Sequence, residues 1–165
     1  RPRAPPFAAA VCCCGLAAFL CGWHVHEKAI LPPLVVLSAL VPGEPRSAQL
    51  HARLLVLLST TAHYSLLPLL HQPAEYLLAR VMCLLYLHLL VHAMRARLGA
   101  AVPLRPVEVA YLRGFGAIEC FCAVVHPALI APRLEFAPLL LTSVYCAVGV
   151  HYSACLAYAY WWREC

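Results

Sequence analysis

Four ionisable side chains stand together near the start of the chain, between two apolar runs: His24, His26, Glu27 and Lys28. They belong to the segment Gly22-Trp23-His24-Val25-His26-Glu27-Lys28-Ala29-Ile30-Leu31, which carries the only lysine of the chain. A permanently charged ammonium beside imidazoles that titrate near neutral pH is suited to binding a phosphate. The residue types therefore predict an anion site.

Two backbone conformations both bring His24 and Lys28 to one face. In an extended loop, side chains alternate, so His24, His26 and Lys28 project to the same side. In a helix, His24 and Lys28 are four residues apart and are again neighbours. We expect these three residues to bind the phosphate, while Glu27 orients a neighbour or meets a sugar hydroxyl. The alternative is a polar interfacial turn without a ligand, in which the lysine reaches toward water.

A zinc site at His24 and His26 would need further ligands. The sequence has no HExxH motif and no paired CxxC motifs to supply them. Most of the ten cysteines lie inside apolar runs, where thiols pack as small hydrophobes. We therefore expect neither a metal nor a cofactor.

The composition is that of a membrane protein. Of 165 residues, 64% are hydrophobic and 12% are charged, and the mean hydropathy is +0.79. Soluble domains have a larger charged fraction. The net charge of +5 comes from scattered basic residues, not from the basic face that nucleic-acid binding requires. We predict an all-α, polytopic membrane helix bundle that contacts membrane lipid and no nucleic acid.

Six apolar runs are candidates for membrane-spanning helices, which need about 20 residues. They cover approximately Phe7–Trp23, Ala29–Val41, Leu50–Leu70, Tyr76–Met94, Val107–Ile130 and Phe136–Trp161. The second run is short and has Pro32-Pro33 near its start, so it is either a tilted span or a re-entrant segment. No linker or internal repeat divides the chain, and we expect one membrane domain over residues 1–165.

The basic residues orient these runs, because cytoplasmic loops carry an excess of lysine and arginine. Six alternating spans put both chain ends and the 42–49 and 95–106 loops on one side. That side holds Arg1, Arg3, Arg46, Arg95, Arg97, Arg105 and Arg163, whereas the other holds only Lys28 and Arg133. The sequence therefore predicts a lumenal 24–28 loop and a cytosolic C-terminus.

Several ionisable residues lie inside the predicted spans, where they are costly and commonly functional. The set comprises His63, Arg80, His88, His92, Arg113 and Glu119. Arg113 and Glu119 are six residues apart, so they point in different directions and have different partners. His88 and His92 are four apart and can both face the bundle interior. The simplest expectation is bonding between helices; residues lining a pathway would instead indicate a transporter fragment.

Three segments resemble the C-terminal part of a known enzyme family. They are Gly22 to Leu31, His63-Tyr64-Ser65-Leu66-Leu67-Pro68-Leu69-Leu70 and Pro138-Leu139-Leu140-Leu141-Thr142-Ser143-Val144-Tyr145-Cys146-Ala147-Val148-Gly149. The segments are similar to the endoplasmic-reticulum alpha-1,3-glucosyltransferases that use dolichyl-phosphate-glucose. The motif Gly-Trp-His-Val-His-Glu-Lys is more similar to the sequence of the members that add the second glucose to the lipid-linked oligosaccharide than to that of the sister enzyme, which adds the first.

This resemblance implies a GT-C type membrane fold with a lumenal active site in the endoplasmic reticulum. It implies inverting transfer of glucose from dolichyl-phosphate-glucose to the monoglucosylated, dolichyl-diphosphate-linked oligosaccharide during N-glycan precursor assembly. Such a reaction needs a carboxylate base on the attacking hydroxyl and cations on the departing phosphate. His24, His26 and Lys28 would then lie on the leaving-group side.

The chain departs from the family in its acidic residues. It contains no aspartate. The resemblance implies that the base of these enzymes is an acidic residue in an early lumenal loop. Glu27 lies within the phosphate-side motif, so we do not expect it to be the base. We expect the chain to be the C-terminal part of a glucosyltransferase that lacks the catalytic base on its own. A noncatalytic membrane subunit that binds a lipid phosphate is the further alternative.

Overall fold

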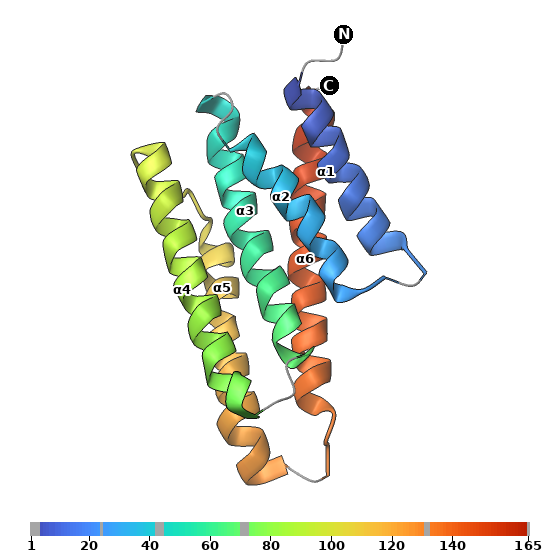
Figure 1. The fold of residues 1–165 in the computed structure, drawn as a ribbon, viewed down its shortest axis with the longest axis vertical. Helices are drawn as coiled ribbons and strands as arrows, with labels where there is room; N and C mark the ends of the chain where they lie inside the picture. Colours follow the sequence, from blue (N-terminus) through green and yellow to red (C-terminus); the bar gives the residue numbers. More distant parts are fainter. Residues whose placement is uncertain (1–3, 24, 42–44, 70–72, 131–132, 165) are drawn as a thin grey trace.

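The computed structural model of the chain is a bundle of helices (Figure 1). It describes residues 4–23, 25–41, 45–69, 73–130 and 133–164, and it has no β-strand in these ranges. The helices are α1 (Ala4–Cys21), the 3₁₀ turn η1 (Glu27–Ile30), α2 (Leu31–Leu40), α3 (Pro45–Leu66), the 3₁₀ turn η2 (Leu67–Leu69), α4 (Pro73–Leu98), α5 (Pro106–Cys120), its π-helical continuation η3 (Phe121–Ile130) and α6 (Ala137–Glu164). Every predicted apolar run coincides with a helix, so the predicted all-α bundle is confirmed.

Within the described part of the chain, three helices are long and apolar enough to cross a membrane. They are Glu75–Leu98, Pro106–Ile130 and Ala137–Trp162, and the protein is therefore a membrane protein. The apolar part of α1, Phe7–Cys21, is shorter, and α2 has only 10 residues. Six complete spans are not established by these lengths, and that number stays a prediction.

The central helix is α3, which lies among α2, α4 and α6 (Figure 1). Every residue from His51 to Ala62 is buried, so protein surrounds this stretch on all sides. Thr60 and Thr61 each donate a hydrogen bond to the carbonyl four residues earlier, at 2.7 and 2.9 Å. A helix enclosed in this way can carry polar side chains, because their partners lie within the bundle and not in lipid.

Consecutive helices alternate in direction. Figure 1 shows both chain ends and the α4–α5 connection toward one end of the bundle, the α1–α2 connection part-way down it, and η3 at the opposite end. The predicted membrane orientation depends on this geometry.

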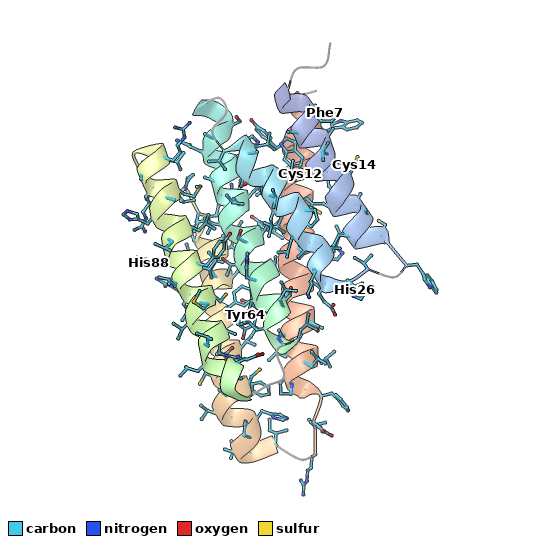
Figure 2. All side chains as sticks on the ribbon, in the orientation of Figure 1. Phe7, Cys12, Cys14, His26, Tyr64 and His88 are labelled. Carbon is cyan, nitrogen blue, oxygen red and sulfur yellow. The ribbon has the colours of Figure 1, made fainter. Side chains whose placement is uncertain are left out.

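The expectation that His88 and His92 face the bundle interior is wrong. Both side chains are exposed, and Figure 2 shows His88 on the outer side of α4. A different face of α4 contacts α3: the Tyr86 ring lies 4.4 Å from the His63 ring, measured between centroids. Four-residue spacing correctly put the two histidines on one face but did not tell which face is covered.

Candidate functional site

The hairpin of α1 and α2 positions the candidate phosphate segment, residues 22–30. The two helices approach closely, because a Cβ at Gly15 would lie only 2.9 Å from Cγ of Pro33. The thiol of Cys12 also donates to the carbonyl of Pro33 at 3.5 Å. Pro33 stands in the first turn of α2, where its fixed φ suits a helix. The packed hairpin therefore fixes both ends of the segment.

Gly22 determines how the chain leaves α1. Its N–H donates to the carbonyl of Ala18 at 3.0 Å. A Cβ at this position would lie 2.3 Å from Cγ2 of Val25 and 2.7 Å from that carbonyl oxygen. Any side chain here would push Val25 away, so the course of the segment requires glycine.

The polar residues follow on a short turn. His26 is extended, with φ −70° and ψ 143°, and precedes η1. The N–H of Ala29 closes the turn by donating to the carbonyl of His26 at 2.8 Å. Ile30 is 1% exposed and packs into the apolar core. This anchor leaves the side chains of His26, Glu27 and Lys28 exposed, as Figure 2 illustrates for His26.

The observed backbone combines the two conformations considered from the sequence. It is extended at His26 and 3₁₀ helical from Glu27 onward. His24 lies outside the described residues, so its convergence with Lys28 stays a prediction. The two ion pairs found among the described residues do not include Lys28. Its ammonium thus lies at the surface with no ion-pair partner in the described part of the bundle.

A second polar cluster is centred on Glu119, and Figure 2 labels one of its members, Tyr64. Glu119 of α5 accepts hydrogen bonds from Tyr64 of α3 at 2.7 Å and from Tyr76 of α4 at 3.0 Å. It also pairs with Arg80, whose guanidinium carbon lies 3.3 Å from the centroid of the Tyr76 ring. Bonding between helices is therefore confirmed for Arg80 and Glu119. Glu119 does not pair with Arg113, in agreement with the expectation that these two residues have different partners.

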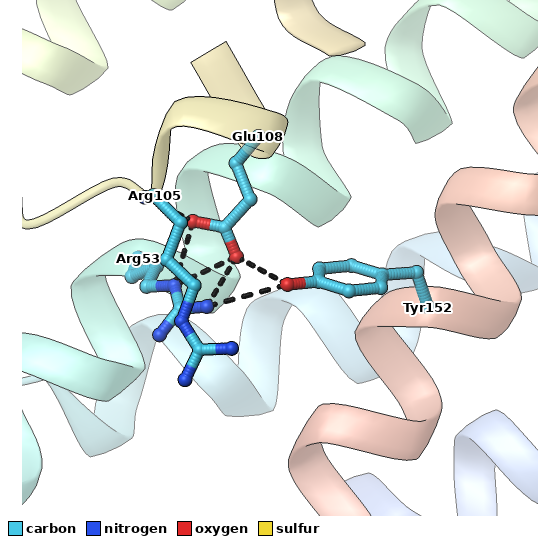
Figure 3. A network of polar contacts seen from close by, with 4 residues as sticks. All are labelled: Arg53, Arg105, Glu108 and Tyr152. Carbon is cyan, nitrogen blue, oxygen red and sulfur yellow. Dashed lines mark hydrogen bonds and ion pairs between the residues drawn. The ribbon is translucent and has the colours of Figure 1, made fainter. Parts of the chain in front are cut away.

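A third polar cluster was missed by the sequence reasoning and joins α3, α5 and α6 (Figure 3). Nε of Arg53 lies 2.8 Å from each carboxylate oxygen of Glu108. The same carboxylate accepts from the Tyr152 hydroxyl and from the N–H of Arg105, both at 2.7 Å. Arg53 is 8% exposed and Glu108 is 2% exposed. This is a buried ion pair with its remaining bonding positions largely occupied.

Two sequence signals could have revealed this cluster. Glu108 stands three residues after Arg105 and two after Pro106, a spacing that favours a helix start with Glu bonded back to the N-cap. The structure has this capping arrangement. Arg53 lies inside an apolar run, and a charge there calls for an opposite charge. What the sequence does not show is that α3 and α5 place these two residues opposite each other.

The described residues include no group of three or more His, Cys, Asp and Glu side chains that could hold a metal ion. The described side chains of the 22–30 segment include one exposed ammonium, one exposed imidazole and one exposed carboxylate. Such a set can bind an anionic group at the α1–α2 connection.

The described residues thus form a helical membrane bundle that exposes His26 and Lys28 at the α1–α2 connection. Residues 1–157 match the ALG6, ALG8 glycosyltransferase family, and the chain belongs to this family. This membership confirms the resemblance seen in the three sequence segments.

The relatives are more specific. The chain is 37% identical over 156 residues to a Bos taurus protein named "Dolichyl pyrophosphate Glc1Man9GlcNAc2 alpha-1,3-glucosyltransferase", covering 93% of this chain and 29% of that protein. Proteins of the same name from Mus musculus and Arabidopsis thaliana are 36% and 32% identical, covering 96% and 82% of the chain and 30% and 28% of those proteins. The chain thus spans less than a third of these curated relatives. No solved structure matches it.

Proposed function

We propose that this chain is part of an endoplasmic-reticulum enzyme that transfers glucose from dolichyl-phosphate-glucose to the monoglucosylated lipid-linked oligosaccharide. The observation that carries the proposal is family membership over residues 1–157. The relatives' printed name gives Glc1Man9GlcNAc2 as the glycan, which favours the second glucose over the first. The sister reaction, addition of the first glucose, is the second candidate because it belongs to the same family.

The 22–30 segment is the proposed site for the donor phosphate. Lys28 offers an exposed ammonium and His26 an exposed imidazole, and His24 completes the set by sequence. In an inverting transfer, an acceptor hydroxyl attacks the anomeric carbon and the bond from that carbon to the phosphate oxygen breaks. Dolichyl phosphate leaves with the bonding electron pair, and the cations stabilise its charge.

The proton of the attacking hydroxyl goes to a general base. We do not assign this role to Glu27, because its carboxylate stands on the same short turn as Lys28 and therefore beside the departing phosphate. Glu27 is assigned instead to orienting a neighbour or to a sugar hydroxyl. No other residue of this chain is proposed as the base.

The proposed membrane placement follows from the same activity. The 24–28 loop is lumenal, the C-terminus is cytosolic, and residues 1–165 form one multi-pass domain. The alternating helix directions and the seven-to-two division of basic residues between the predicted loops support this placement. A glycosylation acceptor site inserted beside Arg133 should be modified, whereas one inserted in the 99–105 connection should not. The opposite pattern would overturn the orientation.

The test of the activity is a chromatographic profile of lipid-linked oligosaccharides from cells in which the parent gene is disrupted. Accumulation of the monoglucosylated species is expected. Full-length protein should restore the profile, whereas Lys28→Ala should lower turnover by about 10²–10³-fold, the usual effect of removing one preorganised charge stabiliser. Arg133→Ala is the matched control, because Arg133 is also exposed but lies in the α5–α6 connection, outside the 22–30 segment.

Each outcome of this test has a different meaning. Accumulation of the unglucosylated species would assign the first glucose instead. An unchanged profile would overturn the glucosyltransferase proposal and favour a transporter. If Lys28→Ala transfers glucose within about twofold of wild type, the phosphate role of the segment is wrong while the activity stands.

A further inference from the structure

The outer face of α4 carries two histidines inside a membrane span. His88 stands near the middle of the span Glu75–Leu98, and His92 follows about one helical turn later. Figure 2 shows His88 on the side of α4 that points away from the bundle, and both side chains are exposed. No residue of this span is buried. The described chain therefore leaves two imidazoles uncovered at the depth of the bilayer.

Neither imidazole has a hydrogen-bond partner among the residues that the structure describes. His151 is also exposed, in the span Ala137–Trp162, but its ring donates to the carbonyl of Ala147 on its own helix at 2.8 Å. His88 and His92 make no such bond. A polar group in hydrocarbon without a hydrogen bond is unfavourable, so these two rings need a partner from elsewhere.

Lipid and water are both poor partners at this position. The hydrocarbon core is about 30 Å thick, so the middle of a span lies about 15 Å from either surface, beyond the reach of an imidazole. Ionisable residues within spans almost always face protein or a water-filled cavity. The neighbours of His88 on the same face, Val81, Leu84 and Leu85, are exposed and apolar. They offer water no hydrogen bonds, which favours protein as the cover.

The covering protein is available within the same polypeptide. The chain spans less than a third of its curated relatives from Bos taurus and Mus musculus. More than two thirds of those proteins therefore has no counterpart in residues 1–165. A segment of the same polypeptide is held beside the bundle at a high effective concentration, which favours it over a separate protein or a second copy.

We propose that a membrane helix of the full-length protein, from outside residues 1–165, packs on the His88 face of α4. This face consists of Val81, Leu84, Leu85, His88 and His92. Its apolar members pack against the partner helix, and a side-chain oxygen of that helix accepts a hydrogen bond from one of the imidazoles. The proposal does not depend on glucose transfer, because it concerns how the bundle is completed.

The first test is photocrosslinking of the full-length protein in native membranes, with a benzophenone amino acid in place of Leu85. Irradiation should join this position to a peptide from outside residues 1–165, identified by mass spectrometry, without a band of higher mass on a denaturing gel. The control is the same probe in place of Leu90, which packs against the apolar core of this bundle. That probe should join to peptides within residues 1–165.

The second test asks whether the imidazoles have a partner. In lipid nanodiscs, the full-length double variant His88→Leu/His92→Leu should unfold at a midpoint about 2 °C or more below that of wild type, because the partner oxygen stays buried and unpaired. The double variant His88→Gln/His92→Gln keeps an N–H donor at each position and should lose less. His151→Leu is the matched control and should not lower the midpoint, because His151 bonds within its own helix.

Other results would overturn the proposal. Adducts of the Leu85 probe with lipid alone, or no adduct, would mean that lipid or water covers this face. A crosslinked band of higher mass would assign it to a separate protein or to a second copy. A midpoint of the leucine double variant at or above that of wild type would mean that the imidazoles have no partner. An equal loss in His151→Leu would mean that the loss does not come from an unpaired partner.

Discussion

Tyr111 of α5 and Tyr145 of α6 bond to each other's main chain. The Tyr145 hydroxyl donates to the carbonyl of Tyr111 at 2.6 Å, and the Tyr111 hydroxyl donates to the carbonyl of Tyr145 at 3.1 Å. The rings are stacked, with centroids 4.6 Å apart and planes 8° apart. Each hydroxyl lies against a glycine of the opposite helix, Gly114 for Tyr145 and Gly149 for Tyr111. The same kind of hydrogen bond, from a tyrosine hydroxyl to a main-chain carbonyl, therefore joins α5 and α6 in both directions.

The tyrosine contact predicts that Gly149→Ala destabilises the protein. A Cβ at this position would lie 2.0 Å from the Tyr111 hydroxyl and 2.8 Å from Oγ1 of Thr61. Forcing a methyl group into a packed interface costs about 1–3 kcal/mol. The measurement is the thermal unfolding midpoint of the full-length protein in detergent. Gly116→Ala is the control, because nothing lies within 4 Å of its Cβ position and alanine favours the helix; similar losses in both variants would contradict the prediction.

The buried pair of Arg53 and Glu108 predicts strong coupling in a double-mutant cycle. Arg53→Met alone leaves a buried carboxylate without its counter-ion and should lose about 3–5 kcal/mol of stability. The double variant with Glu108→Gln should recover a large part of this loss, since neither charge then remains unpaired. Fraction folded after detergent extraction is the readout, and additive losses would show that the two side chains are not coupled.

The pair of Arg80 and Glu119 should behave differently in the same assay. Its side chains are 21% and 28% exposed, compared with 10% and 1% for Arg53 and Glu108. Partial access to solvent weakens the charge interaction and reduces the cost of leaving one charge alone, toward about 1 kcal/mol. A loss from Arg80→Met as large as that from Arg53→Met would mean that burial does not set the difference.

Gly22 links the fold to the proposed chemistry. Gly22→Ala would force Val25 out of its place and shift the turn that carries Lys28. We expect full-length Gly22→Ala to keep its unfolding midpoint but to lose glucose transfer by at least about tenfold, the scale of effect seen when a positioning contact is misplaced. Lipid-linked oligosaccharide profiles measure this. Wild-type transfer by Gly22→Ala would show that the course of the segment is not important for activity.

The positions of the helices could be predicted from the sequence, because long apolar runs must be helical in a bilayer. Helix ends were less predictable. The third run was expected from Leu50, yet α3 begins at Pro45. Residues 45–49 are too polar to mark a span, but proline suits the first turn of a helix and extends α3 beyond the apolar pattern.

The candidate site was predictable in its residue types but not in its partners. His26, Glu27 and Lys28 could be singled out because ionisable residues between apolar runs are unusual. The bonding partners of Glu119 and Glu108 could not be predicted, because each partner lies on a helix that is distant in sequence. Periodicity fixes which residues share a helix face, whereas the neighbour of that face depends on how the helices pack.

The enclosure of α3 has a consequence for how the protein is made. A helix with Arg53, Ser59 and Thr61 along its buried length is a poor candidate for entering the bilayer alone, and it is not among the helices apolar enough to do so by composition. During synthesis α3 is therefore expected to stay at the translocon until α4 and the later helices emerge. The order in which the helices are synthesised then determines when the polar side chains of α3 become buried in the bundle.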